Sequence, residues 1–170
     1  MTSNDVELIR KMLQMQFKLD KAIMDEHKLD KIDEKNLALA ILDKVGKLTH
    51  ELKSEWCWWK KTQTPVDKKI LSELIHIWHF VLSWQNHFNY GEEGIINTCA
   101  VVRNSKRILS LLKTKEYSLS ENLSDLVAWE SCKVENLIAI TEYLGFTIEQ
   151  VYQAYCEKNK VNYQRLKEWY

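Results

Sequence analysis

The sequence predicts an all-α fold in which a bundle of about six helices forms one domain over residues 1–170. Composition and pattern carry this prediction. The chain has only one proline and four glycines, so few positions favour turns. Apolar side chains recur every three or four residues along most of the chain, which is the spacing of one face of an α-helix. Hydrophobic residues make up 45% of the 170 residues, enough to fill the core of one such domain.

The first two helices are expected at residues 3–27 and 33–55. The first begins at an N-cap residue, Ser3 or Asn4, because side-chain oxygens of these types accept hydrogen bonds from the free N–H groups of a first turn. The second is followed by the loop WCWWKKTQTPVD, which contains the single proline. One face of the first helix carries an apolar stripe of Leu8, Met12, Met15, Leu19 and Ile23.

The third and fourth helices are expected at residues 68–88 and 95–113. The third is apolar around most of its circumference, which is typical of a helix buried between neighbours or at a subunit interface. Gly91 and Gly94 separate the two helices.

The last two helices are expected at residues 124–145 and 146–170, with 114–123 as the connection before them. The fifth helix ends at its last residue, a glycine. The sixth has Thr147 as its N-cap and Gln150 at the capping-box position, where a side chain bonds back to the N-cap N–H.

Charge and cysteine content exclude several classes of function. Twenty-four basic residues balance twenty-four acidic ones, so no overall field favours nucleic acid or an anionic membrane, and any anion site must be local. No run of about 18 apolar residues is present, and we expect a soluble cytoplasmic protein. The cysteines form no CxxC pair, which favours reduced, mostly buried thiols over a zinc site; they are Cys57, Cys99, Cys132 and Cys156.

The last helix places three donors on one face. Lys158, Asn162 and Arg165 are spaced by four and three residues, so their side chains lie along the same side of a helix. Such donors suit phosphate oxygens. A solvent-exposed basic face is the alternative interpretation.

Four stretches resemble one known family. The segment LGFTIEQVYQAYCEKNKVNYQRL resembles the closing motif of the dimeric all-α dUTPases, in which a KNxxNxxR-like run grips the substrate phosphates. MLQMQFKLDKAI resembles the family's QxxLDxxI-like signature, and SELIHIWHFVLS resembles its ExxDxxHF helix. WCWWKK resembles the family's Trp- and Lys-containing loop. Together the four stretches span nearly the whole chain in the family's order.

The resemblance implies a fold, a partner and a set of binding residues. The fold would be the helical bundle of the all-α nucleotide pyrophosphatases, assembled as a homodimer that binds dUTP, dUDP or dUMP. Phosphate would be bound by Lys158, Asn162, Arg165 and Lys60. The base would be bound by Gln16, His79, Phe80 and Trp59. Each residue of the base set has a structural alternative: an exposed helical glutamine, a core histidine and phenylalanine, and a tryptophan that seals a core or a dimer contact.

The resemblance fails at the metal ligands. Family enzymes hold two or more Mg²⁺ ions with an ExxE on the second helix and an ExxD on the third. Here Lys44 and Lys47 stand at the two Glu positions, and the third helix keeps Glu73 but has His76 in place of Asp. Because Mg²⁺ prefers oxygen ligands, cationic replacements are expected to abolish its binding. The lysines would then neutralise nucleotide phosphates directly, or simply face solvent.

Three functions follow as hypotheses. The leading one is a dUTPase-like protein that binds a nucleotide and has lost most or all Mg²⁺-dependent turnover. The second is an active dUTP diphosphatase, or a related nucleoside triphosphate pyrophosphatase, with a rearranged metal set of Glu51, Glu55 and Glu73. The third is a dimeric protein-interaction module with a vestigial pocket. A di-iron site built from His50, Glu51, Glu55, Glu73 and His76 is a weaker hypothesis, because the helix-bundle pattern needs two ExxH pairs and only one, Glu73 and His76, is present.

Overall fold

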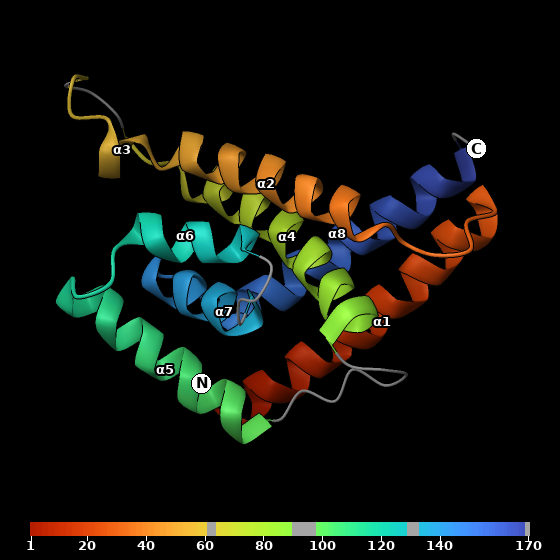
Figure 1. Cartoon of the computed structure of the whole chain (residues 1–170), viewed down its shortest axis with the longest axis horizontal. Helices are drawn as coiled ribbons and strands as arrows, with labels where there is room; N and C mark the ends of the chain where they lie inside the picture. Colours follow the sequence, from red (N-terminus) through yellow and green to blue (C-terminus); the bar gives the residue numbers. More distant parts are fainter. Residues whose placement is uncertain (61–63, 90–97, 129–132, 169–170) are drawn as a thin grey trace.

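The described part of the chain is helical, which confirms the all-α prediction (Figure 1). The computed structural model describes residues 1–60, 64–89, 98–128 and 133–168, and these residues contain no strand. Gly91 and Gly94 lie outside them. The helices are α1 (Ser3–His27), α2 (Glu34–Glu51), α3 (Lys53–Trp56), α4 (Asp67–Trp84), a π-helical turn η1 (Gln85–Asn89), α5 (Thr98–Thr114), α6 (Leu119–Val127), α7 (Lys133–Tyr143) and α8 (Ile148–Glu168).

The helix starts follow capping chemistry, with one correction. At α8 the expected capping box is present: Thr147 Oγ1 accepts from the Gln150 N–H at 3.2 Å, and Gln150 Oε1 accepts from the Thr147 N–H at 2.9 Å. At α1 the N-cap is Thr2, not Ser3 or Asn4 as predicted. Thr2 forms a capping box with Asp5, and this reciprocal pair places the N-cap one or two residues before the predicted position.

The structure divides the region of the expected connection and fifth helix into helices differently from the prediction. Helix α6 lies mostly within the predicted connection, because Ser118 forms a capping box with Glu121 and starts a helix there. It ends at Val127, and the C-cap residue Ala128 has an extended backbone. The ammonium of Lys133, the first residue of α7, donates to the carbonyl of Leu126 at 3.1 Å and to that of Ala128. A buried lysine therefore satisfies carbonyls at the end of α6.

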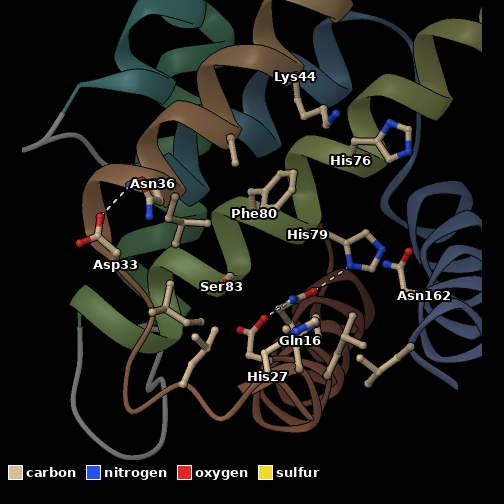
Figure 2. A pocket seen from close by; sticks show the side chains of 18 of the residues that line it. Gln16, His27, Asp33, Asn36, Lys44, His76, His79, Phe80, Ser83 and Asn162 are labelled. Atoms are coloured by element: carbon tan, nitrogen blue, oxygen red, sulfur yellow. Dashed lines mark hydrogen bonds between the residues drawn. The ribbon is translucent and has the colours of Figure 1, made fainter. Parts of the chain in front are cut away.

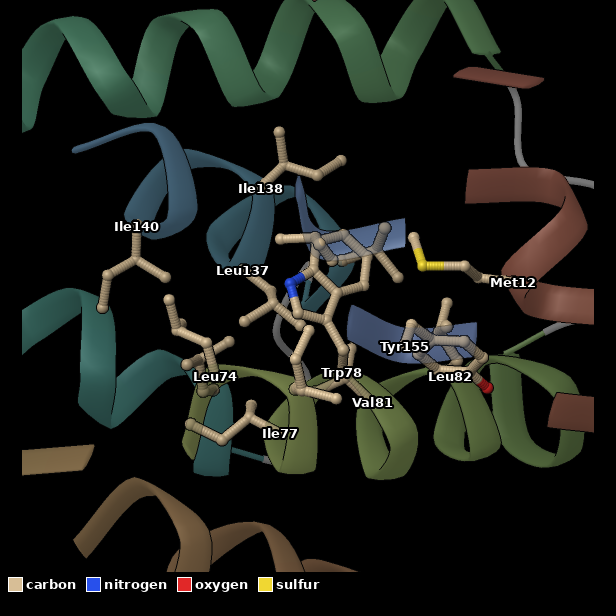
Figure 3. Packing of buried hydrophobic residues seen from close by; sticks show 14 of the residues in the cluster. Met12, Leu74, Ile77, Trp78, Val81, Leu82, Leu137, Ile138, Ile140 and Tyr155 are labelled. Carbon is tan, nitrogen blue, oxygen red and sulfur yellow. The ribbon is translucent and has the colours of Figure 1, made fainter. Parts of the chain in front are cut away.

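Helix α4 is the centre of the fold and contacts α1, α2, α7 and α8. Figure 3 shows Trp78 of α4 surrounded by apolar side chains from α4, α7 and α8. The Trp78 indole N–H donates to Thr141 Oγ1 of α7 at 3.2 Å, so this fully buried polar group has a partner. Helix α5 packs on the far side of α7 through Ile108 and Leu112. This packing fixes α1, α2, α4 and α8, the helices that carry the candidate site.

Two further expectations concern the thiols and the membrane. Cys57 is buried and Cys156 is half-buried, and both are free thiols. The side chains of Cys99 and Cys132 lie outside the described part. Among the described helices, none combines the length and apolar character needed to cross a bilayer.

Candidate functional site

A cavity of about 670 Å³ lies between α1, α2, α4 and α8 (Figure 2). Side chains of all four helices line it, so segments far apart in sequence meet there. Most of its accessible lining is apolar, with a small number of polar and charged side chains, as is usual for a small-molecule site. The cavity brings together eight of the residues selected from the sequence: Gln16, Lys44, His76, His79, Phe80, Lys158, Asn162 and Arg165.

One part of the lining is cationic. Lys44 of α2 faces the same cavity as Lys158 and Arg165 of α8. Burial lowers the pKa of Lys158, and the positive charges of Arg165 and Lys44 lower it further, while Glu73 opposes them. Like charges held near one another in a partly buried place favour an anion between them. Lys44, Lys158 and Arg165 are therefore suited to bind phosphate.

The acids near these cations already have partners. Glu73 Oε2 lies 3.2 Å from His76 Nδ1 on the same helix. Burial lowers the pKa of His76, although the hydrogen bond to Glu73 opposes this shift. Asp43 lies 2.7 Å from Lys44 Nζ and 3.0 Å from Lys47 Nζ, and these two hydrogen bonds lower the pKa of its carboxyl group. Lys47 stays on the exposed surface and does not line the cavity.

A buried hydrogen-bond network also contributes to the lining. The Gln16 amide nitrogen donates to Asp20 Oδ1 at 2.6 Å. Its oxygen accepts from the Tyr155 hydroxyl at 2.6 Å and from His79 Nδ1 at 2.7 Å. The second Asp20 oxygen lies 3.2 Å from His87 Nε2. Burial lowers the pKa of His79 to about 3, so its ring is neutral at physiological pH.

Comparison with known families shows which family the chain belongs to. A family model described as dUTPase matches residues 8–170. The chain belongs to the all-α dUTPase family. A search of curated proteins finds no match. In this dUTPase-family protein, the cavity lies against α8, whose sequence resembles the family's closing motif, and α2 and α4 also line it.

The residues of this dUTPase-family chain do not fit the Mg²⁺ ions that the family generally uses. Mg²⁺ needs several oxygen ligands. On the cavity side of α2 and α4 stand the ammonium group of Lys44 and the imidazole of His76, and Glu73 is bonded to that imidazole. Within the described ranges, no three His, Cys, Asp or Glu side chains are grouped so that they could hold a metal ion. Glu51 and Glu55, at the end of α2 and in α3, do not line the cavity.

The tryptophan loop does not reach the cavity in the single chain of this dUTPase relative. Figure 1 shows α3 at the end of α2 that lies away from the C-terminal end of α8. Trp59 is 57% exposed and packs edge-on against Trp56 and Trp58. Lys60 follows it and is also exposed, and neither residue lines the cavity.

The sequence analysis missed three members of the buried network: Asp20, His87 and Tyr155. Asp20 lies within the stretch that resembles the first family signature, four residues after Gln16, which is a helical neighbour spacing. Tyr155 lies one turn before Lys158 on α8. His87 follows α4 in η1, and no sequence pattern marks it. Their helical spacing could have identified Asp20 and Tyr155.

Proposed function

We propose that this protein binds dUTP or dUDP in the cavity without magnesium and hydrolyses the nucleotide slowly or not at all. The observation that carries the proposal is the position of Lys44, which lines the cavity with Lys158 and Arg165 where family enzymes hold metal. A lysine ammonium supplies the positive charge that nucleotide phosphates need. The protein would thus keep the family's ligand while losing the family's cofactor.

The polar side chains that line the cavity support one orientation of the nucleotide. Lys158, Asn162 and Arg165 repeat on one face of α8, and their donors would contact the phosphates together with Lys44. Gln16, His79 and Phe80 line the other part, and there the base would lie. This arrangement uses seven of the eight sequence-selected residues that line the cavity, all except His76, and leaves Lys47, Trp59 and Lys60 without a role in the same chain.

Catalysis is expected to be weak for a physical reason. Hydrolysis of a phosphoanhydride in this family depends on a metal-activated water, and a lysine ammonium stabilises phosphate charge without generating a hydroxide. When Mg²⁺ is bound in family enzymes, it supplies that nucleophile. The chain's own described residues bind and orient the phosphates.

The decisive experiment is calorimetric titration with dUTP and its non-hydrolysable imido analogue, with Mg²⁺ and with EDTA. We expect the same affinity in both buffers, and a strong decrease in Lys158→Gln. Lys35→Gln, an exposed change on α2 outside the cavity, is the matched control. Turnover with Mg²⁺ on the order of 1 per second or more would contradict the proposal and favour an active diphosphatase.

A gain-of-function variant tests the cause of the inactivity. Lys44→Glu, Lys47→Glu and His76→Asp together would restore the family's acidic positions. We expect Mg²⁺-dependent binding or hydrolysis only in this triple variant. If no nucleotide binds to the wild-type protein in any buffer, the cavity is vestigial and the interaction-module hypothesis takes its place.

We further expect a homodimer, because members of this family are typically oligomeric. The outer face of α2 supports self-association: Leu39 is 62% exposed and Leu42 is 50% exposed. Light scattering measures the mass in solution, and Leu42→Lys should shift it from dimer to monomer. A monomeric wild-type protein would refute this expectation.

A further inference from the structure

Helix α5, which lies away from the cavity, has an exposed basic face. Its sequence contains four basic residues and no acidic one. The rest of the chain has 20 basic and 24 acidic residues, so α5 is a local centre of positive charge in a protein of zero formal net charge. All four basic side chains are exposed, and together they form the basic face: Arg103, Lys106, Arg107 and Lys113.

Helical geometry places these cations along one side of α5. Their spacings of one, three, four and six residues keep them within one side of a helix with 3.6 residues per turn. Arg103 and Lys113, the first and the last, are about 15 Å apart along the axis. The small side chain of Ser110 is exposed between them. The opposite side of α5 is buried against α7 through Ile108 and Leu112, and Figure 1 shows α5 at the edge of the fold.

The basic face has no partner within the described part of the chain. None of its four cations forms an ion pair with a residue that the structure describes. The large hydrophobic side chains with high exposure lie in other segments, and none of them belongs to the described part of α5. A membrane-bound helix inserts an apolar face into lipid, and a protein interface has an apolar core. Because the apolar side of α5 is already packed on α7, the basic face suits a polyanion instead.

We propose that the basic face of α5 is a docking surface for double-stranded DNA, which it contacts through phosphates without reading the base sequence. One strand of a duplex carries a phosphate every 3.4 Å or so of its axis, so about 15 Å of α5 spans about four phosphates. Arginine and lysine make such contacts. The major groove of DNA is about 12 Å wide and admits a helix, whereas that of an RNA duplex is deep and narrow.

This docking surface is separate from the proposed nucleotide site. No residue of α5 lines the cavity between α1, α2, α4 and α8. The inference therefore goes beyond the proposed function and does not depend on it. A protein that fails to bind dUTP would refute the proposed function alone, and its affinity for DNA would be unaffected.

Salt-dependent binding of a labelled DNA duplex tests the docking surface. Fluorescence anisotropy measures the affinity of the wild-type protein for a duplex of about 20 base pairs at several salt concentrations. We expect a dissociation constant of about 1–100 μM at physiological salt, the range of non-specific DNA binding. Four phosphate contacts release counterions, so the plot of log affinity against log salt concentration should have a slope of about −3.6.

Two matched double variants separate the basic face from net charge. Arg103→Gln with Arg107→Gln removes two of the four cations, so we expect the slope to fall to about −1.8 and the affinity at about 50 mM salt to fall about 10- to 200-fold. Lys11→Gln with Lys18→Gln removes the same charge from exposed positions of α1 and should change the affinity by less than about threefold. Circular dichroism should show the wild-type helix content in both variants, because all four side chains are exposed.

Several results would overturn the proposal. One is a wild-type protein that does not bind the duplex at about 50 mM salt. Another is an equal loss of affinity in the α5 and α1 double variants, which would assign the binding to net charge. Tighter binding of an RNA duplex of the same sequence, or of polyglutamate, would favour RNA or an acidic protein as the partner. The wild-type salt dependence needs no variant, so it decides the question even if a double variant does not fold.

Discussion

Replacing Gln16 by leucine removes the residue that makes three hydrogen bonds of the buried network, while it keeps a side chain of similar size. Three hydrogen bonds of 2.6, 2.7 and 2.6 Å are lost. The Tyr155 hydroxyl and the His79 N–H are left in the interior without an acceptor, at a cost of about 1–3 kcal/mol each. Asp20 keeps His87, and burial of the leucine returns about 1–2 kcal/mol. The free energy of unfolding should therefore fall by about 1–4 kcal/mol.

Urea unfolding followed by circular dichroism measures this difference. The control is Gln14→Leu, an exposed position on the same helix, which should change the stability by less than about 0.5 kcal/mol. Tyr155→Phe alone should cost about 1 kcal/mol, but in the Gln16→Leu background it removes a hydroxyl that has already lost its acceptor. The pair should thus show a coupling of about 1 kcal/mol. If Gln16→Leu lowers the free energy of unfolding no more than Gln14→Leu does, the buried hydrogen-bond network does not stabilise the protein.

Three further predictions concern the scaffold. Ser118→Ala removes the capping box of α6 and should lower the stability by about 1 kcal/mol in urea unfolding, with an unchanged value contradicting the cap. Thr141→Val leaves the Trp78 indole N–H without its acceptor and should cost about 1–3 kcal/mol; a thermal midpoint equal to that of the wild-type protein would refute this. Burial lowers the pKa of Lys133 from 10.5 to about 8, so the folded state loses this proton before the unfolded state does, and stability should rise with pH between about 8 and 10.5. Lys133→Met should remove that contribution, which unfolding curves of both proteins across this range would measure.

The sequence was informative wherever a structure depends on neighbours along the chain. The box of Thr147 and Gln150 and the shared face of Lys158 and Arg165 are local patterns, and the structure shows both the box and the common cavity wall. Ser118 and Glu121 form the same kind of local signal, which could have identified α6 within the expected connection.

Other features depend on packing between distant segments. The end of α6 at Ala128 is stabilised by Lys133 from the next helix. The bond between Gln16 and Tyr155 joins positions 139 residues apart, so only the packing of α1 against α8 brings them together. Lys44 and Lys47 look equivalent in sequence, yet only Lys44 lies on the cavity side of α2. The periodicity of apolar residues identifies the buried face of a helix. The packing of the neighbouring helices decides which residues at the edge of that face are covered.

The buried lysine between α6 and α7 has a consequence for how the protein opens. The Lys133 ammonium holds the last carbonyls of α6, lies 4.5 Å from the ring centroid of Trp84, and is itself the first residue of α7. Helix α6 cannot leave its place without breaking the bonds to this ammonium, and α7 cannot leave without breaking both those bonds and the contact with Trp84 of α4. Amide hydrogen exchange should therefore protect α6 and α7 as one cooperative unit, with similar opening free energies despite the difference in their lengths.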